Sequence, residues 1–491
     1  MSTLRNPALV QECTTLVAAI HADAHLEASK VETTSPDNES LESLDSDFLS
    51  AFRDVAADVL ASSTSADAGD EDRLLRVLDQ QLERAYRRFY DFVYAELPYC
   101  WRLLYTELSI LKFCVRVLES AERQAANDDE EKLLDELVAV LDKALILAGG
   151  AGRRRGRAAI SRLLSLVDTP ARASQTAALP ATFPPDRNLT PPVMSPIKIV
   201  DCASMSWFQE YLDSAGAAGP EPLVLKSLLT TWPALSSRPW ASPRYLLSRT
   251  HAGRRLVPVE VGRSYVDEGW TQELIPFREL LSRICDEGKE EEDDDAREGD
   301  NEDEGKKPKT YLAQHELFSQ LPHLRDDILT PDHCFTSPPA HPLDPAKNKP
   351  ELDVPLINAW LGPSGTITPL HTDGYHNLLC QVVGSKYLRL YSPADSEAVC
   401  PRGADEEEVD MSNTSAFDVG AVEGWDADPE GRDPIETEEF RGLRHWDCVL
   451  EAGDVLYIPI GWWHYVRSLS VSFSVSFWWN GDHYVGGHVD E

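Results

Sequence analysis

The sequence has no cysteine pair with the C-x-x-C spacing and no apolar run long enough to cross a membrane. Its nine cysteines are scattered, and an odd number cannot all be paired in disulfides. This usage favours a reducing compartment over secretion and gives no support for a structural zinc site. The N-terminus also shows no secretory signal and no lipidation motif. We therefore expect a soluble intracellular protein, nuclear and/or cytoplasmic, with no membrane partner.

The sequence also has few basic residues relative to acidic ones. The 491 residues include 46 lysines and arginines but 83 aspartates and glutamates, a formal net charge of -37. Such a surface would repel a phosphate backbone, so direct nucleic-acid binding is not expected, and basic protein tails are easier partners. Part of the acid lies in low-complexity runs such as Glu290–Asp295, which weakens this inference. One basic run, Arg153 to Arg157, allows either a nuclear import signal or a solvated helix end or loop, and we favour the solvated helix end or loop.

A chain of 491 residues predicts two domains plus linkers. The first third of the chain has a helical pattern. Apolar residues recur at steps of three and four, with charged residues between them, in 41–60, 73–97, 101–118 and 132–147. Gly149 and Gly150 follow the last of these segments, as expected past a helix end. Residues 1–167 are therefore predicted to form an all-α domain of four to six helices.

The remaining chain has the pattern of a β-rich domain. Residues 168–196 are rich in Pro, Ala and Ser and predict a linker. Short apolar β-prone runs then appear, which favours a jelly roll in 197–491 and an α+β protein overall. The expected strands are 223–225, 255–261, 356–361, 377–383, 387–391, 454–458 and 471–479.

Turns and insertions punctuate this second domain. Gly384-Ser385, between two of the expected strands, predicts a hairpin turn. Two acidic insertions, 286–307 and 401–439, have little apolar periodicity and predict mobile loops.

Three residues could hold a metal ion. His371 and Asp373 are two positions apart, so in an extended strand they share one face. His464 follows another expected strand and could supply a third ligand. Two imidazoles and one carboxylate leave adjacent coordination positions open, as non-haem Fe(II) oxygenases require. Lys386, on a later strand, would be costly inside an apolar barrel unless a ligand carboxylate paired with it, although a surface lysine at a hairpin is an equally ordinary interpretation.

The segments around these residues carry a family resemblance. They are the stretches 357–377, 384–393, 459–466 and 472–479, with further similarity at 257–262 and 311–315. Together they closely resemble the JmjC hydroxylases, and within them the group of lysine-specific demethylase 8, also called JMJD-five. The resemblance implies a C-terminal double-stranded β-helix of the cupin type behind a helical N-terminal region. It covers most of 197–480 outside the two insertions.

The resemblance also implies a role for individual residues. His371, Asp373 and His464 match the Fe(II) ligands. The residues that match the binding site of the co-substrate 2-oxoglutarate are Tyr311, Thr368, Asn377 and Lys386, and those that match a pocket favouring an arginine side chain are Glu260, Tyr265 and Trp360. Residues 373–376, Asp-Gly-Tyr-His, depart from the family's pattern just after the second ligand, which leaves substrate preference near the metal open.

The expected function is therefore the oxidation of a protein side chain with Fe(II), 2-oxoglutarate and O2. Peptidyl-arginine hydroxylation is the first hypothesis, because a carboxylate with aromatic neighbours suits a guanidinium. Histone N-methyl-lysine demethylation is the alternative, so the partner would carry arginine or methyl-lysine and could be a histone or a chromatin-associated protein. The rival from another class is a catalytically silent cupin-like binding module.

Overall fold

The computed structural model describes residues 3–25, 41–64, 71–93, 96–122, 127–168, 173–185, 187, 189–266, 269–294, 308–404, 410–427 and 433–481. The chain divides into two compact units. The first comprises Met1–Ala171 with His251–Leu256, and the second comprises Arg172–Thr250 with Val257–Glu491. Among the described residues, no helix combines the length and the apolar character that a membrane crossing requires.

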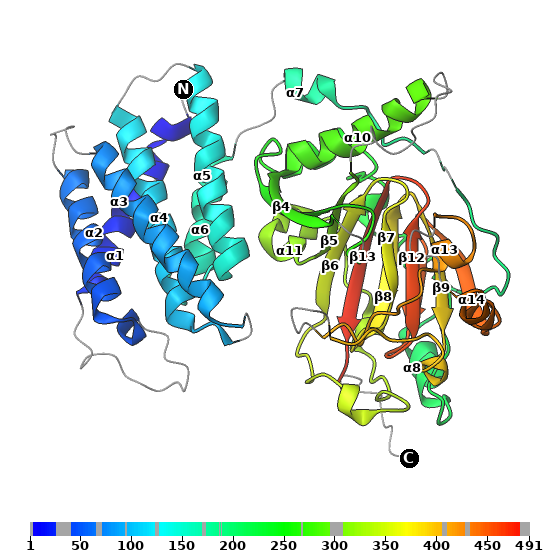
Figure 1. Cartoon of the computed structure of the whole chain (residues 1–491). Coiled ribbons are helices and arrows are strands. Elements are labelled where there is room, and N and C mark those ends of the chain that lie inside the picture. The colour runs from blue at the N-terminus through cyan, green and yellow to red at the C-terminus, as the bar shows by residue number, and fades with distance from the viewer. Residues whose placement is uncertain are drawn as a thin grey trace, which may run out of the picture. The chain divides into compact units, whose positions relative to one another are not determined.

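The first unit is helical (Figure 1). Its α-helices are α1 (Pro7–Ala24), α2 (Ser46–Thr64), α3 (Glu71–Arg87), α4 (Tyr99–Glu122), α5 (Asn127–Ala148) and α6 (Gly156–Val167). Helix α4 packs against α1, α3 and α5 and is buried along most of its length, as its dense apolar sequence requires. The basic run at the start of α6 is partly internal, because Arg155 forms ion pairs with Glu107 and Asp23.

Two β-sheets form the centre of the second unit (Figure 1). The larger sheet has the order β1-β2-β11-β8-β13-β6-β5-β3-β4, and the smaller has the order β10-β9-β12-β7. The strands of the larger sheet are β1 (Lys198–Asp201), β2 (Leu223–Lys226), β3 (Leu256–Val261), β4 (Thr271–Pro276), β5 (Thr310–His315), β6 (Leu356–Gly362), β8 (His376–Val383), β11 (Val455–Ile458) and β13 (Ser472–Trp479). Those of the smaller sheet are β7 (Ile367–His371), β9 (Ser385–Tyr391), β10 (His445–Glu451) and β12 (Trp463–Ser468).

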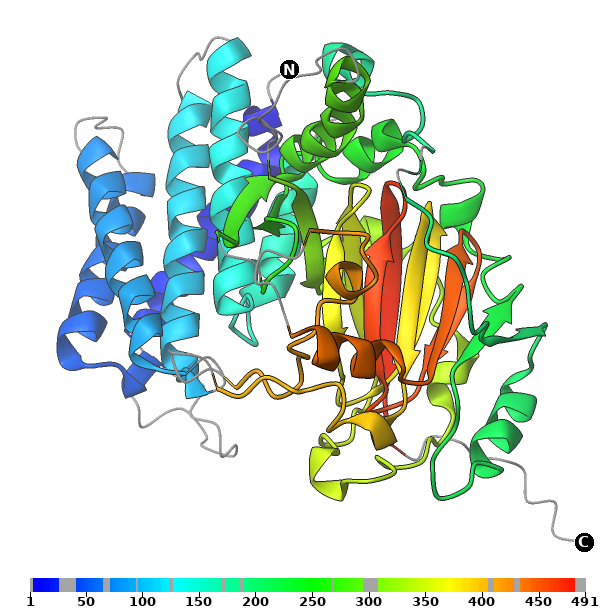
Figure 2. The same cartoon turned by 45° about the vertical axis from the view of Figure 1, so that its right-hand side comes forward.

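Side-chain alternation gives the small sheet two apolar faces. Leu388 and Leu390 of β9 share a buried cluster with Leu379 and Ile458 of the large sheet, so this face looks into the space between the sheets. Tyr387 and other residues at alternate positions form a second cluster on the outer face, with residues of α13 (Val419–Val422) and α14 (Pro434–Arg441). Figure 2 shows these two helices over the small sheet. The fold is thus the predicted α+β arrangement with a cupin-like C-terminal part.

The remaining α-helices of this unit are short or peripheral. They are α7 (Ala173–Ala178), α8 (Met205–Asp213), α9 (Pro243–Arg249), α10 (Phe277–Asp294), α11 (Leu317–Gln320) and α12 (Pro322–Arg325). Helix α7 lies within the segment that we predicted as linker. At the end of that segment, the backbone N–H groups of Met194 and Ser195 donate hydrogen bonds to the buried Asp447 carboxylate.

Three local predictions were wrong. The hairpin turn at Gly384 is instead a crossover, because β8 and β9 belong to different sheets. Gly384 has φ +68°, and a Cβ there would lie 1.9 Å from the Val471 carbonyl oxygen. The acidic insertion 286–307 begins as helix, because α10 continues to Asp294, and its part 295–307 lies outside the described residues.

The third error concerns 401–439, which is not simply a mobile loop. Its described part contains all of α13 and most of α14, and Phe417 is buried in the outer cluster of the small sheet. Residues 405–409 and 428–432 lie outside the described residues.

Candidate active site

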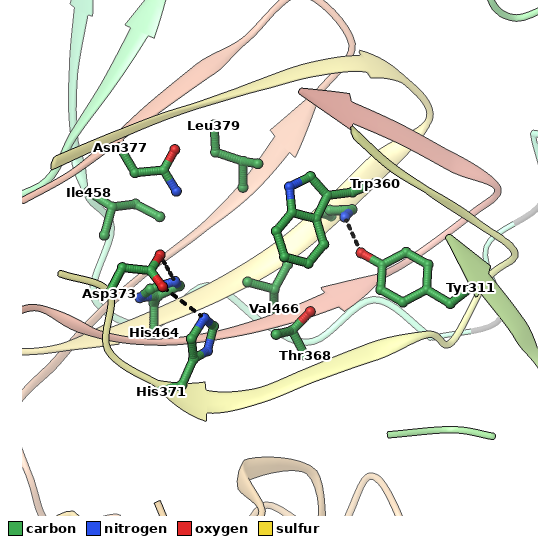
Figure 3. A pocket seen from close by; sticks show the side chains of 11 residues that line it. Tyr311, Trp360, Thr368, His371, Asp373, Asn377, Leu379, Ile458, His464 and Val466 are labelled. Atoms are coloured by element: carbon green, nitrogen blue, oxygen red, sulfur yellow. Dashed lines mark hydrogen bonds and ion pairs between the residues drawn. The ribbon is translucent and has the colours of Figure 1, made fainter. Parts of the chain in front are cut away.

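The three candidate metal ligands meet at the end of one strand pair. His371 is the last residue of β7, Asp373 follows it, and His464 lies on β12 directly opposite His371 in the antiparallel register. Asp373 lies 3.8 Å from His371 and 3.5 Å from His464, measured from carboxylate oxygen to Nε2. One ligand atom from each residue lies within 4.8 Å of the others. Figure 3 shows the three side chains gathered at one end of a pocket.

Backbone carbonyls orient both imidazoles. The Nδ1 atom of His371 lies 2.7 Å from the Pro369 oxygen, and that of His464 lies 3.0 Å from the Trp462 oxygen. A carbonyl only accepts, so each Nδ1 carries the proton and each Nε2 lone pair is free to bind a metal. Burial, and then the nearby His371, place the pKa of His464 well below its usual range, which favours the neutral form that a metal requires. Burial also raises the pKa of Asp373, and the nearby His371 offsets part of this effect.

The metal ligands lie on the lining of a pocket between the two sheets. The structure places eight of the ten predicted site residues on its lining. They are Tyr311, Trp360, Thr368, His371, Asp373, Asn377, Lys386 and His464. Figure 3 shows Tyr311 and Trp360 at the end away from the metal ligands. The pocket therefore joins the candidate metal position to the candidate co-substrate residues.

Lys386 is the principal charge at the far end. It is 2% exposed, and its ammonium group donates a hydrogen bond to the Tyr311 hydroxyl at 3.2 Å. Within the part of the chain that the structure describes, no carboxylate pairs with it, and burial lowers the pKa of Lys386 to about 7. The Oδ1 atom of buried Asn377 also has no hydrogen-bond partner there. The buried ammonium fits an anionic ligand, to which the Asn377 amide can donate only through Nδ2.

Glu260 and Tyr265 lie outside the pocket lining. Glu260 pairs with Tyr311 in the register of β3 and β5, and burial raises the pKa of its carboxyl. Burial raises the pKa of Tyr265 as well, and the charges of Asp373 and Glu260 raise it further. Tyr265 is therefore close enough to both carboxylates for their charges to affect its hydroxyl. Trp360 is fixed in orientation, because its indole N–H donates to the Ser476 hydroxyl at 2.9 Å.

Four further residues at the site were not predicted. Leu379, Ile458 and Val466 supply an apolar wall to the pocket. Strand alternation could have identified two of them, since Leu379 is two positions from Asn377 and Val466 two from His464. Thr414, which lies opposite His371 in an antiparallel bridge, carried no sequence signal because its segment had been assigned to a loop.

Comparison with known proteins agrees with this geometry. A family model described as "Cupin-like domain" matches residues 210–483. The chain is 33% identical over 427 residues to "Jumonji C domain-containing protein 5" of Drosophila melanogaster, covering 86% of this chain and 91% of that protein. It is 39% identical over 293 residues to "Lysine-specific demethylase 8" of Danio rerio, covering 59% of this chain and 60% of that protein. It is also 39% identical over 261 residues to "Lysine-specific demethylase JMJ30" of Arabidopsis thaliana, covering 53% and 50%.

The fold and the site together define a cupin-like protein with a two-histidine, one-carboxylate centre. The chain belongs, within that class, to the JmjC family of 2-oxoglutarate-dependent oxygenases. It spans 60% of the length of the Danio rerio relative and half of the Arabidopsis thaliana relative.

Proposed function

We propose that this chain is an Fe(II)- and 2-oxoglutarate-dependent dioxygenase that hydroxylates an arginine side chain of a protein substrate. His371, Asp373 and His464 would hold the iron, since one ligand atom of each lies within 4.8 Å of the others and both Nε2 lone pairs are free. When bound, Fe(II) with 2-oxoglutarate and O2 supplies the oxidising power that inserts oxygen into a C–H bond. The chain itself supplies ligands, orientation and an apolar wall that excludes water.

The pocket's far end supports the co-substrate assignment. Lys386 would pair with the distal carboxylate of 2-oxoglutarate, because its buried ammonium has no carboxylate partner among the described residues. The Tyr311 hydroxyl is the neutral hydrogen-bonding group beside Lys386, and Thr368 is on the same lining, whereas Figure 3 shows Asn377 nearer the metal ligands. The distal carboxylate would thus meet a charge-assisted contact and one or two neutral ones, and Asn377 would meet the part of the co-substrate nearer the metal.

The observation that carries the arginine assignment is the partly buried carboxylate of Glu260. No described lysine or arginine forms an ion pair with it, and burial raises the pKa of Glu260. A substrate guanidinium would compensate this charge with a forked hydrogen bond, and the aromatic faces of Tyr265 and Trp360 could stack on it. A partly buried carboxylate without a cationic partner among the described residues therefore favours a cationic substrate side chain.

N-methyl-lysine demethylation is the second candidate. Two relatives are named lysine-specific demethylases, and hydroxylation of an N-methyl group would release it as formaldehyde. A methyl-lysine favours an aromatic cage over a single carboxylate, so Glu260 argues for arginine. The third candidate, a silent cupin-like module, is disfavoured because the three metal ligands and Lys386 are all present.

The partner in this proposal is a protein substrate, with histones and other chromatin-associated proteins as test cases. A net charge of -37 suits basic protein tails better than nucleic acid. The proposed location is intracellular, nuclear and/or cytoplasmic.

The test uses the full chain loaded with Fe(II) and 2-oxoglutarate under anaerobic conditions and then exposed to O2. Matched peptides carry either arginine or methyl-lysine, and peptide mass and formaldehyde are measured. We expect one added oxygen on the arginine peptide, with no product from His371→Ala and a raised KM for Glu260→Gln. Formaldehyde with methyl loss would replace the proposal with demethylation. A wild-type protein that binds no iron would replace it with the silent module.

A further inference from the structure

A segment of the second acidic insertion extends the small sheet beside the metal ligands. Strand β7 is an edge strand, and residues 413–415 lie along its open edge. The backbone N–H of Thr372 donates to the Asn413 oxygen at 2.8 Å, and that of Ser415 donates to the Leu370 oxygen at 2.7 Å. These bonds place Thr414 directly opposite His371 in an antiparallel bridge. The insertion thus closes the edge from which His371 and Asp373 project.

The Thr414 side chain connects this edge to Tyr265. Thr414 is 1% exposed, and its hydroxyl donates to Asn413 Oδ1 at 3.3 Å. Because that hydroxyl has one proton, the Tyr265 hydroxyl at 3.2 Å must donate to it. Asn413 also donates from Nδ2 to the Thr372 carbonyl at 3.4 Å, at the outer limit of a hydrogen bond. A chain of polar contacts therefore runs from the metal-ligand strand, through Thr414, to the Tyr265 ring.

Ion pairs hold the segment after residue 415 onto the outer face of the sheet. Arg467 of β12 forms a two-point ion pair with Asp426, with N to O distances of 2.6 and 3.0 Å. Arg389 of β9 pairs with Glu423 at 2.5 Å, and Arg263 pairs with Asp418 at 2.9 Å. A two-point pair of this kind is more directional than a surface ion pair. Residues 413–426 are consequently fixed at both the polar edge and the outer face.

We propose that Thr414 is a positioning residue that holds the Tyr265 ring at the substrate side of the site through its hydroxyl. The inference rests on the proposed function, because Tyr265 is there a substrate-binding residue. Thr414 contributes no ligand to the metal and does not line the pocket. Its loss should therefore change the handling of the protein substrate and leave metal and 2-oxoglutarate binding intact.

The test is a double-mutant cycle in the full chain. Thr414→Val keeps the side-chain volume but removes the hydroxyl, Tyr265→Phe removes the other partner, and Thr414→Ser restores a hydroxyl. One hydrogen bond of ordinary strength predicts a rise of about 3- to 10-fold in KM for the arginine peptide in Thr414→Val and in Tyr265→Phe. The double variant should be no worse than either single variant, and Thr414→Ser should recover most of the loss. Mn(II) affinity and the KM for 2-oxoglutarate should stay within about twofold of the wild type.

Multiplying effects in the double variant, or an unchanged peptide KM in Thr414→Val, would overturn the proposal. A fall in Mn(II) affinity would also overturn it, since Thr414 would then act on the metal ligands. The proposed function fails separately, when the wild-type protein oxidises no arginine peptide. In that case the KM values of the same variants are measured with any methyl-lysine peptide that is turned over. The hydroxyl contact itself is tested by urea unfolding of the same variants, and additive losses of unfolding free energy in the double variant would overturn the inference.

Discussion

Replacing Lys386 with methionine should weaken 2-oxoglutarate binding and at the same time stabilise the ligand-free protein. Burial lowers the pKa of Lys386 from 10.5 to about 7. At 1.36 kcal/mol for each pH unit, keeping the ammonium form inside the fold costs on the order of 5 kcal/mol. Methionine removes this cost. The Tyr311 hydroxyl then loses its hydrogen-bond partner, which lowers the gain in unfolding free energy by about 1–3 kcal/mol. We expect a net stabilisation of about 2 kcal/mol or more at pH 7.

The pH dependence has a definite sign. Between pH 7 and 10.5 the unfolded chain keeps the lysine proton while the folded chain has lost it, so the wild type becomes more stable as pH rises. From pH 7 to pH 9 this amounts to about 2–3 kcal/mol, and Lys386→Met should lack it. Bound 2-oxoglutarate would compensate the ammonium and flatten the wild-type slope.

The assay is urea unfolding of both proteins at pH 7 and pH 9, with tryptophan fluorescence as the signal. All tryptophans except Trp101 lie in the second unit, so the signal reports on the unit that contains Lys386. In parallel, 2-oxoglutarate is titrated without O2 into the Mn(II)-loaded proteins. Loss of a charge-assisted contact predicts an affinity about 10- to 100-fold lower.

Lys198→Met is the matched control, because Lys198 is exposed on β1, and it should leave 2-oxoglutarate affinity unchanged. A Lys386→Met protein that is less stable than the wild type at pH 7, yet binds 2-oxoglutarate normally, would refute the reasoning.

Three further changes test the site and its scaffold. His464→Ala should lower Mn(II) affinity at least 100-fold, measured by calorimetry, because one of three ligands is lost. Asp426→Asn should lower the unfolding free energy of the second unit by about 3 kcal/mol, since it leaves the largely buried Arg467 without its counter-charge, and the peptide KM should rise as in Thr414→Val. Trp479→Ala should cost about 3–5 kcal/mol in urea unfolding, because this indole is fully buried against Phe208, and should leave metal affinity per folded molecule unchanged.

Two strands that the sequence identified are buried on both faces, but burial alone did not decide the outcome, because β12 is equally buried and was not among the expected strands. Every side chain of β8 and β9 is buried, and both were predicted within about two residues. Strand β7 was not among the expected strand ranges, although His371 and Asp373 were placed on an extended segment, and Pro369 within it argues against a strand in the middle of a sheet. It is tolerated because β7 lies at the edge of its sheet. Local composition does not specify which strand will lie at an edge.

The sequence also did not predict which strands would pair with one another. The Gly384 turn was located correctly, but its hairpin interpretation failed, because a sharp turn also suits a chain that crosses from one sheet to the other. In the insertion 401–439 the acidic residues suggested solvent exposure, whereas Glu423 and Asp426 meet arginines on a sheet face. Those arginines come from distant strands, so only the folded chain pairs them. The H-x-D spacing, in contrast, is local, and it placed His371 and Asp373 together.

The two faces of the small sheet differ in whether their basic side chains have carboxylate partners. On the outer face, Arg389 and Arg467 alternate with aromatic residues and are matched by carboxylates of the insertion. On the inner face, Lys386 is buried among apolar side chains with no carboxylate partner in the described chain. Matched charges fix a scaffold, whereas an unmatched buried charge lowers stability until a ligand of opposite sign arrives. The outer pairs should therefore contribute to folding in every state, and the Lys386 charge should begin to contribute only when an anion occupies the pocket.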